Sequence, residues 1–83
     1  MRLGLVLAAL AVGAAAPPGA SSCTGCHGAG SPVGVLAGRE AGSTEGAMKA
    51  FGDGERPATL MNRIAKGFTP EQTHAIAAWF AQQ

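Results

Sequence analysis

The segment CTGCH, residues 23–27, contains both cysteines of the 83-residue chain and one of its two histidines. Two cysteines separated by two residues and followed at once by a histidine form the pattern of covalent haem attachment. On a helical turn, Cys23 and Cys26 lie on one face, so both sulfurs can reach the same side of a porphyrin. His27 is then placed to bind the iron. The pattern predicts one haem c, held covalently through both thiols.

Three other uses of paired cysteines agree less well with the rest of the chain. A structural zinc site needs four ligands, and besides the three in this segment only the distant His74 remains among the cysteines and histidines. A redox dithiol of the thioredoxin type follows a strand, and no strand-like alternation occurs in the sequence. A disulfide alone leaves the adjacent His27 unexplained.

The elements that carry these residues are expected to be helices. A first helix runs through the haem motif, with its N-cap at Ser21 or Ser22, and Gly28 and Gly30 end it. The glycine-rich stretch that follows, as far as Gly42, predicts a loop.

Two further helices are expected in the middle of the chain. Ser43 or Thr44 caps the first of them, which Gly52 and Gly54 stop. Pro57 opens the second, a shorter helix that ends near Gly67.

The last helix has the clearest signals. Thr69 is a good N-cap, Pro70 suits the first helical position, and Gln72 lies where the partner of a capping box belongs. An apolar stripe follows, formed by Ile76, Trp79 and Phe80. The sequence therefore predicts an all-α protein, with Trp79 in its core.

The first twenty residues have the layout of an export signal. Arg2 precedes an uninterrupted apolar run over 3–16, and small residues and prolines follow. This run is shorter than the ~20 residues needed to span a bilayer. We expect a signal peptide over 1–20, cleaved between 15 and 20, and a mature domain over 21–83 in the periplasm. An uncleaved signal segment would be its only attachment to a membrane.

Charge and core size limit the function further. The chain has six Lys and Arg residues and five Asp and Glu residues, and one basic residue, Arg2, lies in the expected leader. The mature part is then neutral, which does not favour nucleic acid or an anionic membrane as a partner. So short a chain usually needs a cofactor, metal or disulfide to complete its core.

The residues alone leave the second axial ligand of the haem iron open. Histidine and methionine ligation is common in small electron-carrying cytochromes, and the thioether raises the reduction potential. Besides Met1, the chain has Met48 and Met61. Methionine is also an ordinary core side chain, and His74 is a further candidate.

The sequence from Cys23 to Ala81 resembles class I cytochrome c. The resemblance rests on CTGCHGAGS, VLAGRE and AMKAFGDGERPATLMNRIAKGFTPEQTHAIAAWFA. It is strongest to the cytochrome c domains of the flavocytochrome c sulfide dehydrogenase group. The resemblance implies a small cytochrome c fold of about four short helices around one covalent haem. It also implies a single-electron carrier, not an enzyme, with a sulfide- or sulfur-oxidising flavoprotein as redox partner.

The same resemblance implies roles for single residues. The methionine between the arginine and the RIAKG segment, Met61, is the expected distal ligand. The carbonyl of Pro32 is expected to accept a hydrogen bond from the ring of His27, and Leu36 is expected to pack on the haem.

Two alternatives to this function remain. If Met61 does not bind the iron, the open position would suit a haem enzyme or a gas sensor. If it does, the chain could also be a general electron donor to a respiratory oxidase.

Overall fold

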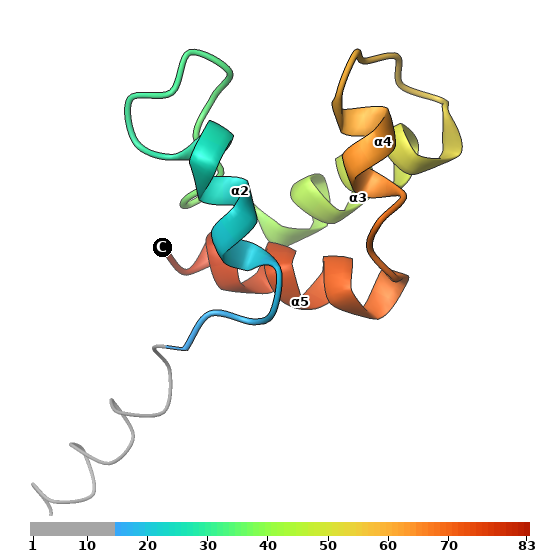
Figure 1. Cartoon of the computed structure of the whole chain (residues 1–83). Coiled ribbons are helices and arrows are strands. Elements are labelled where there is room, and N and C mark those ends of the chain that lie inside the picture. The colour runs from blue at the N-terminus through green and yellow to red at the C-terminus, as the bar shows by residue number, and fades with distance from the viewer. Residues whose placement is uncertain (1–14) are drawn as a thin grey trace, which may run out of the picture.

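The computed structural model describes residues 15–83, which form four helices and contain no strand (Figure 1). The helices are α2 (Ala20–His27), α3 (Ala41–Asp53), α4 (Met61–Ala65) and α5 (Pro70–Ala81). The all-α prediction is confirmed for this part of the chain. Most of the predicted signal peptide, residues 1–14, lies outside the described residues.

The helix α5 begins as its sequence predicts. The Thr69 hydroxyl accepts a hydrogen bond from the Gln72 backbone N–H at 3.1 Å, and the Gln72 side chain accepts one from the Thr69 N–H at 2.8 Å. With Pro70 at the first helical position, this is a complete capping box. The start of α5 is therefore fixed by contacts within four residues.

The apolar face of α5 forms the core together with α2. Ile76 and Phe80 are buried with Ala20 in one cluster, and several half-buried side chains pack against it: Cys23, Leu36, Phe68 and Trp79. The Trp79 and Phe80 rings meet edge to face, with centroids 4.9 Å apart. The core thus joins the helix of the haem motif to the C-terminal helix.

The start of α2 differs from the prediction. Its N-cap is Gly19, with φ of 90°, and no side chain caps the helix. The Ser22 hydroxyl instead donates to the Gly19 carbonyl at 2.6 Å. A Cβ atom on Gly19 would lie 2.7 Å from the ring of Phe68, so glycine allows the chain to pass close to that ring. The packed chain therefore begins before residue 21.

The start of α3 also differs. Its N-cap is Glu40, whose carboxylate accepts hydrogen bonds from the backbone N–H groups of Gly42 and Ser43, each at 2.9 Å. The predicted caps, Ser43 and Thr44, therefore lie inside the helix. A long acidic side chain here satisfies the first free N–H groups and favours the positive end of the helix dipole.

Of the two glycines expected to stop α3, Gly54 does so and Gly52 lies within the helix. Gly52 packs against α4, where an added Cβ would lie 3.8 Å from that of Ala65. The helix ends at Gly54, which has φ of 80° and suits a left-handed C-cap. Residues from Pro57 onward do not yet form a helix, and α4 begins only at Met61.

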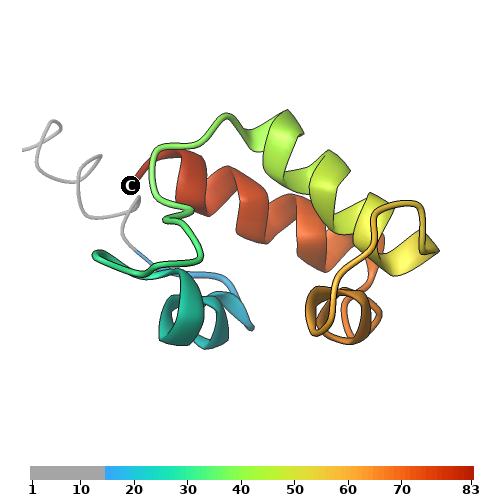
Figure 2. The ribbon, with the colours of Figure 1, turned by 90° about the horizontal axis from the view of Figure 1, so that it is seen from above.

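The four helices form two arms on a common base. In Figures 1 and 2, α2 and α4 lie apart, near opposite ends of α5. The helix α3 packs against both α4 and α5. The arrangement separates the helix that ends at His27 from the helix that begins at Met61. Within residues 15–83, none of the helices has the length and apolar character needed to cross a membrane.

Candidate haem-binding site

Both cysteines of the haem motif lie on α2 as free thiols. Cys23 is half-buried and packs against the core cluster, whereas Cys26 is exposed. Their spacing of three residues places both on one side of the helix. The helix therefore presents two unpaired thiols, one anchored in the core and one accessible from outside.

The environment of Cys23 does not favour redox-dithiol chemistry. Burial raises the pKa of its thiol, and a side-chain hydrogen bond with Ser22 offsets only part of that rise. The Cys23 sulfur also lies 3.8 Å from the Gly19 carbonyl oxygen, to which the thiol donates. Reactive redox cysteines have a lowered pKa instead.

Among residues 15–83, no cluster of three or more His, Cys, Asp or Glu side chains is arranged to hold a metal ion.

His27 is the last residue of α2 and is half-buried. Its Nδ1 atom lies 3.0 Å from the carbonyl oxygen of Gly34. Because a carbonyl only accepts, Nδ1 carries the proton, and the lone pair of the neutral ring is on Nε2. Histidine metal ligands are commonly held in this way through their second nitrogen. The ring is therefore in the tautomer that can bind a metal through Nε2.

The resemblance implies that the carbonyl of Pro32 holds His27, but in the structure the carbonyl of Gly34 does so. The loop turns tightly before it, since the Gly34 N–H donates to the Ser31 carbonyl at 3.3 Å. Gly34 has φ of 101°. This conformation is open to glycine and aims its carbonyl at the imidazole.

Further contacts fix the loop that contains Gly34. The Ser31 hydroxyl donates to the Cys26 carbonyl. The Leu36 N–H donates to the His27 carbonyl at 3.4 Å, and Arg39 Nε donates to the Val35 carbonyl at 3.0 Å. The loop is thus tied to the end of α2, where the candidate ligand lies.

Leu36, expected to face the haem, is half-buried beside the core cluster of α2 and α5. Ordinary core packing would give the same contacts.

Met61, the expected distal ligand, is the first residue of α4 and is half-buried. No side chain caps this helix at Leu60. The side chain of Asn62, the next residue, instead accepts a hydrogen bond from the Ala58 N–H at 2.8 Å. Met61 therefore lies at the end of a loop that its neighbour helps to hold.

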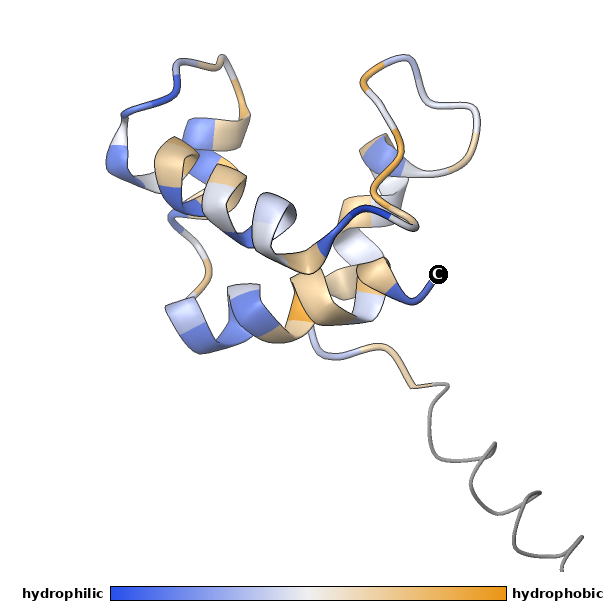
Figure 3. Cartoon of the chain, turned by 180° about the vertical axis from the view of Figure 1, so that it is seen from behind, coloured by the Kyte–Doolittle hydropathy of each residue, from blue (hydrophilic) through white to orange (hydrophobic). Residues whose placement is uncertain are grey.

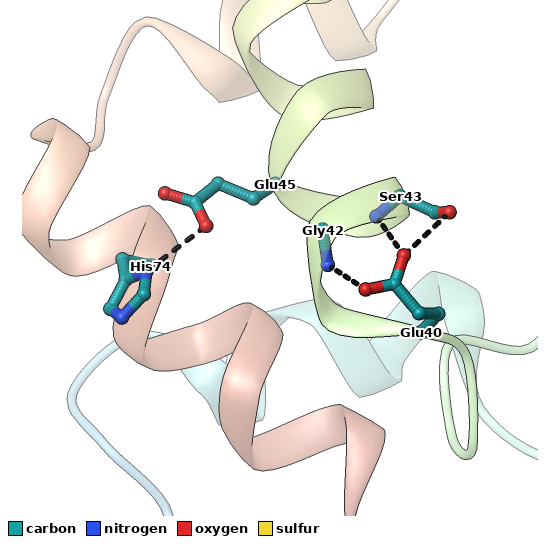
Figure 4. A network of polar contacts seen from close by, with 5 residues as sticks. All are labelled: Glu40, Gly42, Ser43, Glu45 and His74. Carbon is teal, nitrogen blue, oxygen red and sulfur yellow. Dashed lines mark hydrogen bonds and ion pairs between the residues drawn. The ribbon is translucent and has the colours of Figure 1, made fainter.

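The two other candidates for the distal ligand have different surroundings. Met48 is half-buried in α3 and lines a groove with Phe68, Pro70 and Thr73, to which α2 contributes no residue. His74 is exposed on α5, and its Nδ1 lies 3.0 Å from a carboxylate oxygen of Glu45 (Figure 4). His74 therefore links α5 to α3 on the surface.

Comparison with known proteins finds relatives of the chain. No family model matches the chain. It is 40% identical over 63 residues to the cytochrome subunit of sulfide dehydrogenase from Chlorobaculum tepidum, a match to 71% of this chain and 57% of the relative. It is 40% identical over 74 residues to a thiosulfate dehydrogenase electron acceptor from Thiomonas intermedia, a match to 78% of this chain and 34% of the relative. The chain is a cytochrome c homologue.

The chain spans about half the length of the first relative and about a third of the second. The resemblance to the cytochromes of sulfide dehydrogenases is confirmed. Because these relatives are cytochromes, the similarity implies that this chain also binds a haem. The all-helical structure is consistent with a small cytochrome c fold.

The described residues of the cytochrome c homologue fit a haem chemically. Its two arms carry exposed apolar side chains beside the candidate ligands: Val33 is 64% exposed on the loop after His27, and Leu60 is 56% exposed before Met61. Figure 3 shows apolar segments on the loop after α2. No large side chain within residues 15–83 is completely buried. A flat apolar group would cover such residues and enlarge the core.

Three residues with clear contacts at this site, Gly34, Arg39 and Asn62, are not marked by the sequence. Gly34 and Arg39 lie in a stretch rich in glycine, where sequence gives no sign of which carbonyl meets the imidazole. Asn62 is marked only by its position after Met61.

Proposed function

We propose that this chain is a monohaem c-type cytochrome that carries single electrons. Its haem is held through the sulfurs of Cys23 and Cys26, and the iron ligands are His27 Nε2 and the sulfur of Met61. The main support is the 3.0 Å contact from His27 Nδ1 to Gly34, at the end of the helix that carries both thiols. That contact is typical of a metal-binding histidine.

When bound, the haem supplies one site for one electron, because its iron alternates between the ferric and ferrous states. The chain orients the imidazole through the loop at Gly34 and offers a neutral, soft thioether at Met61, which favours ferrous iron. If His27 and Met61 both hold the iron, the chain would leave no position there for a substrate. The proposal is therefore a carrier without catalytic activity of its own.

Haem attachment can be tested directly. The purified protein should keep its haem after acid-acetone extraction and have the mass of the chain plus one haem. Replacing Cys23 and Cys26 together with serine should leave an unmodified and poorly folded chain, because the haem supplies much of the core. Thr24→Ser, between the two cysteines, is the matched control and should retain the haem. Loss of the pigment from the wild type on extraction would contradict covalent attachment.

The proposed electron donor is a dehydrogenase that oxidises a reduced sulfur compound, such as a flavoprotein. Both relatives are named for such enzymes, one for sulfide and one for thiosulfate. A two-electron donor would reduce two molecules of this chain, or one molecule twice if that molecule passes its first electron on before it accepts the second. Binding should be weak, as is typical of small redox interfaces.

The partner can be tested by mixing the oxidised cytochrome with a reduced sulfide dehydrogenase flavoprotein in a stopped-flow instrument. Reduction should be much faster than with an unrelated flavoprotein dehydrogenase. Equal rates would favour a general carrier, such as a donor to a respiratory oxidase.

The proposed location is the periplasm, after removal of the N-terminal segment as a signal peptide. The support is the charged and then apolar order of the first residues. The location can be tested by fractionating the cells and staining the periplasmic extract for the peroxidase activity of haem c. A stained band of this protein in that extract would support the proposal.

A further inference from the structure

The side chain of Asn62 makes three hydrogen bonds, one to the end of α3 and two to the loop between α3 and α4. Its Nδ2 donates to the carbonyls of Phe51 and Arg56, each at 2.9 Å, and its Oδ1 accepts from the Ala58 N–H at 2.8 Å. An asparagine amide has two N–H donors, and both are used here. One side chain thus joins the end of α3, the middle of the loop and the first turn of α4.

Little else holds the last part of this loop. Its first part is tied to α3, because the Arg56 N–H donates to the Ala50 carbonyl at 3.1 Å and the guanidinium lies 4.7 Å from the centre of the Phe51 ring. The residues from 57 to 60 are all exposed. A helix of five residues such as α4 is not stable by itself. The position of Met61, the first residue of α4, therefore depends on hydrogen bonds from neighbouring side chains.

We infer that Asn62 is a positioning residue for Met61. The amide fixes the end of the loop against the end of α3, and this sets where the adjacent thioether begins. Groups that hold a metal ligand in place commonly change metal affinity by about 10–100-fold when they are removed. The inference rests on the proposed function, in which Met61 binds the haem iron.

The sharpest variant is Asn62→Asp. This change keeps the shape of the side chain and an oxygen that accepts from the Ala58 N–H. It replaces the NH2 group, which donates to the carbonyls of Phe51 and Arg56, with a second carboxylate oxygen that cannot donate. The oxidised holoprotein should lose much of the weak near-infrared band that methionine sulfur gives on ferric iron. The ferrous protein should take up carbon monoxide about tenfold faster, or more, than the wild type.

Gln72→Ala is the matched control. It removes an amide side chain that also accepts a backbone hydrogen bond at 2.8 Å, in the capping box of α5, away from the loop. It should lower the urea midpoint while leaving the near-infrared band and the slow uptake of carbon monoxide as in the wild type. Asn62→Ser, which removes both donors without adding charge, replaces Asn62→Asp if that variant does not fold.

The possible outcomes distinguish failure of this inference from failure of the proposed function, in which Met61 binds the haem iron. If the Asn62 variants are destabilised like Gln72→Ala but keep the band and resist carbon monoxide, Asn62 only stabilises the loop and the inference is wrong. If the wild type itself lacks the band, the ligand role of Met61 fails and the inference fails with it. Loss of the band in the Asn62 variants alone supports both.

Discussion

The Nδ1 atom of His27 lies 3.0 Å from the carbonyl oxygen of Gly34, seven residues further along the chain. Gly34 has φ of 101°, which L side chains rarely adopt. The orientation of the candidate ligand therefore depends on a backbone conformation that glycine makes accessible.

Gly34→Ala should both destabilise the holoprotein and change its reduction potential. The backbone strain should cost about 1–3 kcal/mol. A poorer hydrogen bond to Nδ1 makes the imidazole a weaker donor to ferric iron, so the potential should rise. Urea unfolding and a potentiometric titration measure the two effects.

Gly30→Ala is the matched control for this change. Gly30 also has a positive φ, of 79°, and an added Cβ would meet nothing within 4 Å. The control should lose similar stability and keep the potential of the wild type. Equal potentials in the two variants would show that the Gly34 carbonyl does not tune the iron.

The N-cap of α3 should make the stability of the fold depend on pH. Hydrogen bonds from Gly42 and Ser43 lower the pKa of the Glu40 carboxyl. Because the folded-state pKa is lowered, this stabilisation is complete above the ordinary value of about 4.3. It is lost as the pH falls through the folded-state value.

Glu40→Gln should therefore lower the urea midpoint at neutral pH, and its difference from the wild type should shrink below about pH 4. Glu71→Gln is the control, since Glu71 also lies in the first turn of a helix but its side chain makes no hydrogen bond within residues 15–83. It should change the midpoint at neutral pH less. A Glu40→Gln difference of the same size at about pH 3 would argue against the carboxylate cap.

The mature protein should begin before Gly19. Ala20 is completely buried in the core, and Gly19 passes within contact of Phe68. Cleavage at the end of the predicted range would remove both residues and their packing. The intact mass of the exported holoprotein identifies the first residue, and a chain that begins at Ser21 would contradict this prediction.

How much the sequence could predict depends on the range of the contacts. The start of α5 is predicted correctly because Thr69, Pro70 and Gln72 interact only with one another. The end of α3 is predicted only in part: Gly54 ends the helix as expected, but Gly52 lies within it, where the helix packs against α4. Local signals favour a stop there, and tertiary packing overrides them.

The same distinction applies to the candidate site. The CTGCH motif identifies the thiols and the first axial ligand because their spacing is itself the signal. The partner of His27 depends on how a loop with several glycines folds back, which shifts it from Pro32 to Gly34. The bonds of Asn62 reach up to eleven residues along the chain, and no local pattern marks them.

The choice between carrier and enzyme depends on Met61. Met61→Ala should abolish the near-infrared band of the oxidised protein, lower the reduction potential and open the iron to carbon monoxide, because the thioether that favours ferrous iron is lost. Met48→Ala is the control. Met48 is only half-buried, in a groove that α2 does not line, so its loss should cost roughly 1–2 kcal/mol, less than for a fully buried methionine, and leave the band intact.

If the band instead survives Met61→Ala and disappears in Met48→Ala, the distal ligand is Met48 and the carrier proposal stands. A wild-type protein that lacks the band and binds carbon monoxide readily has an open iron position, which fits a haem enzyme or gas sensor and not an electron carrier.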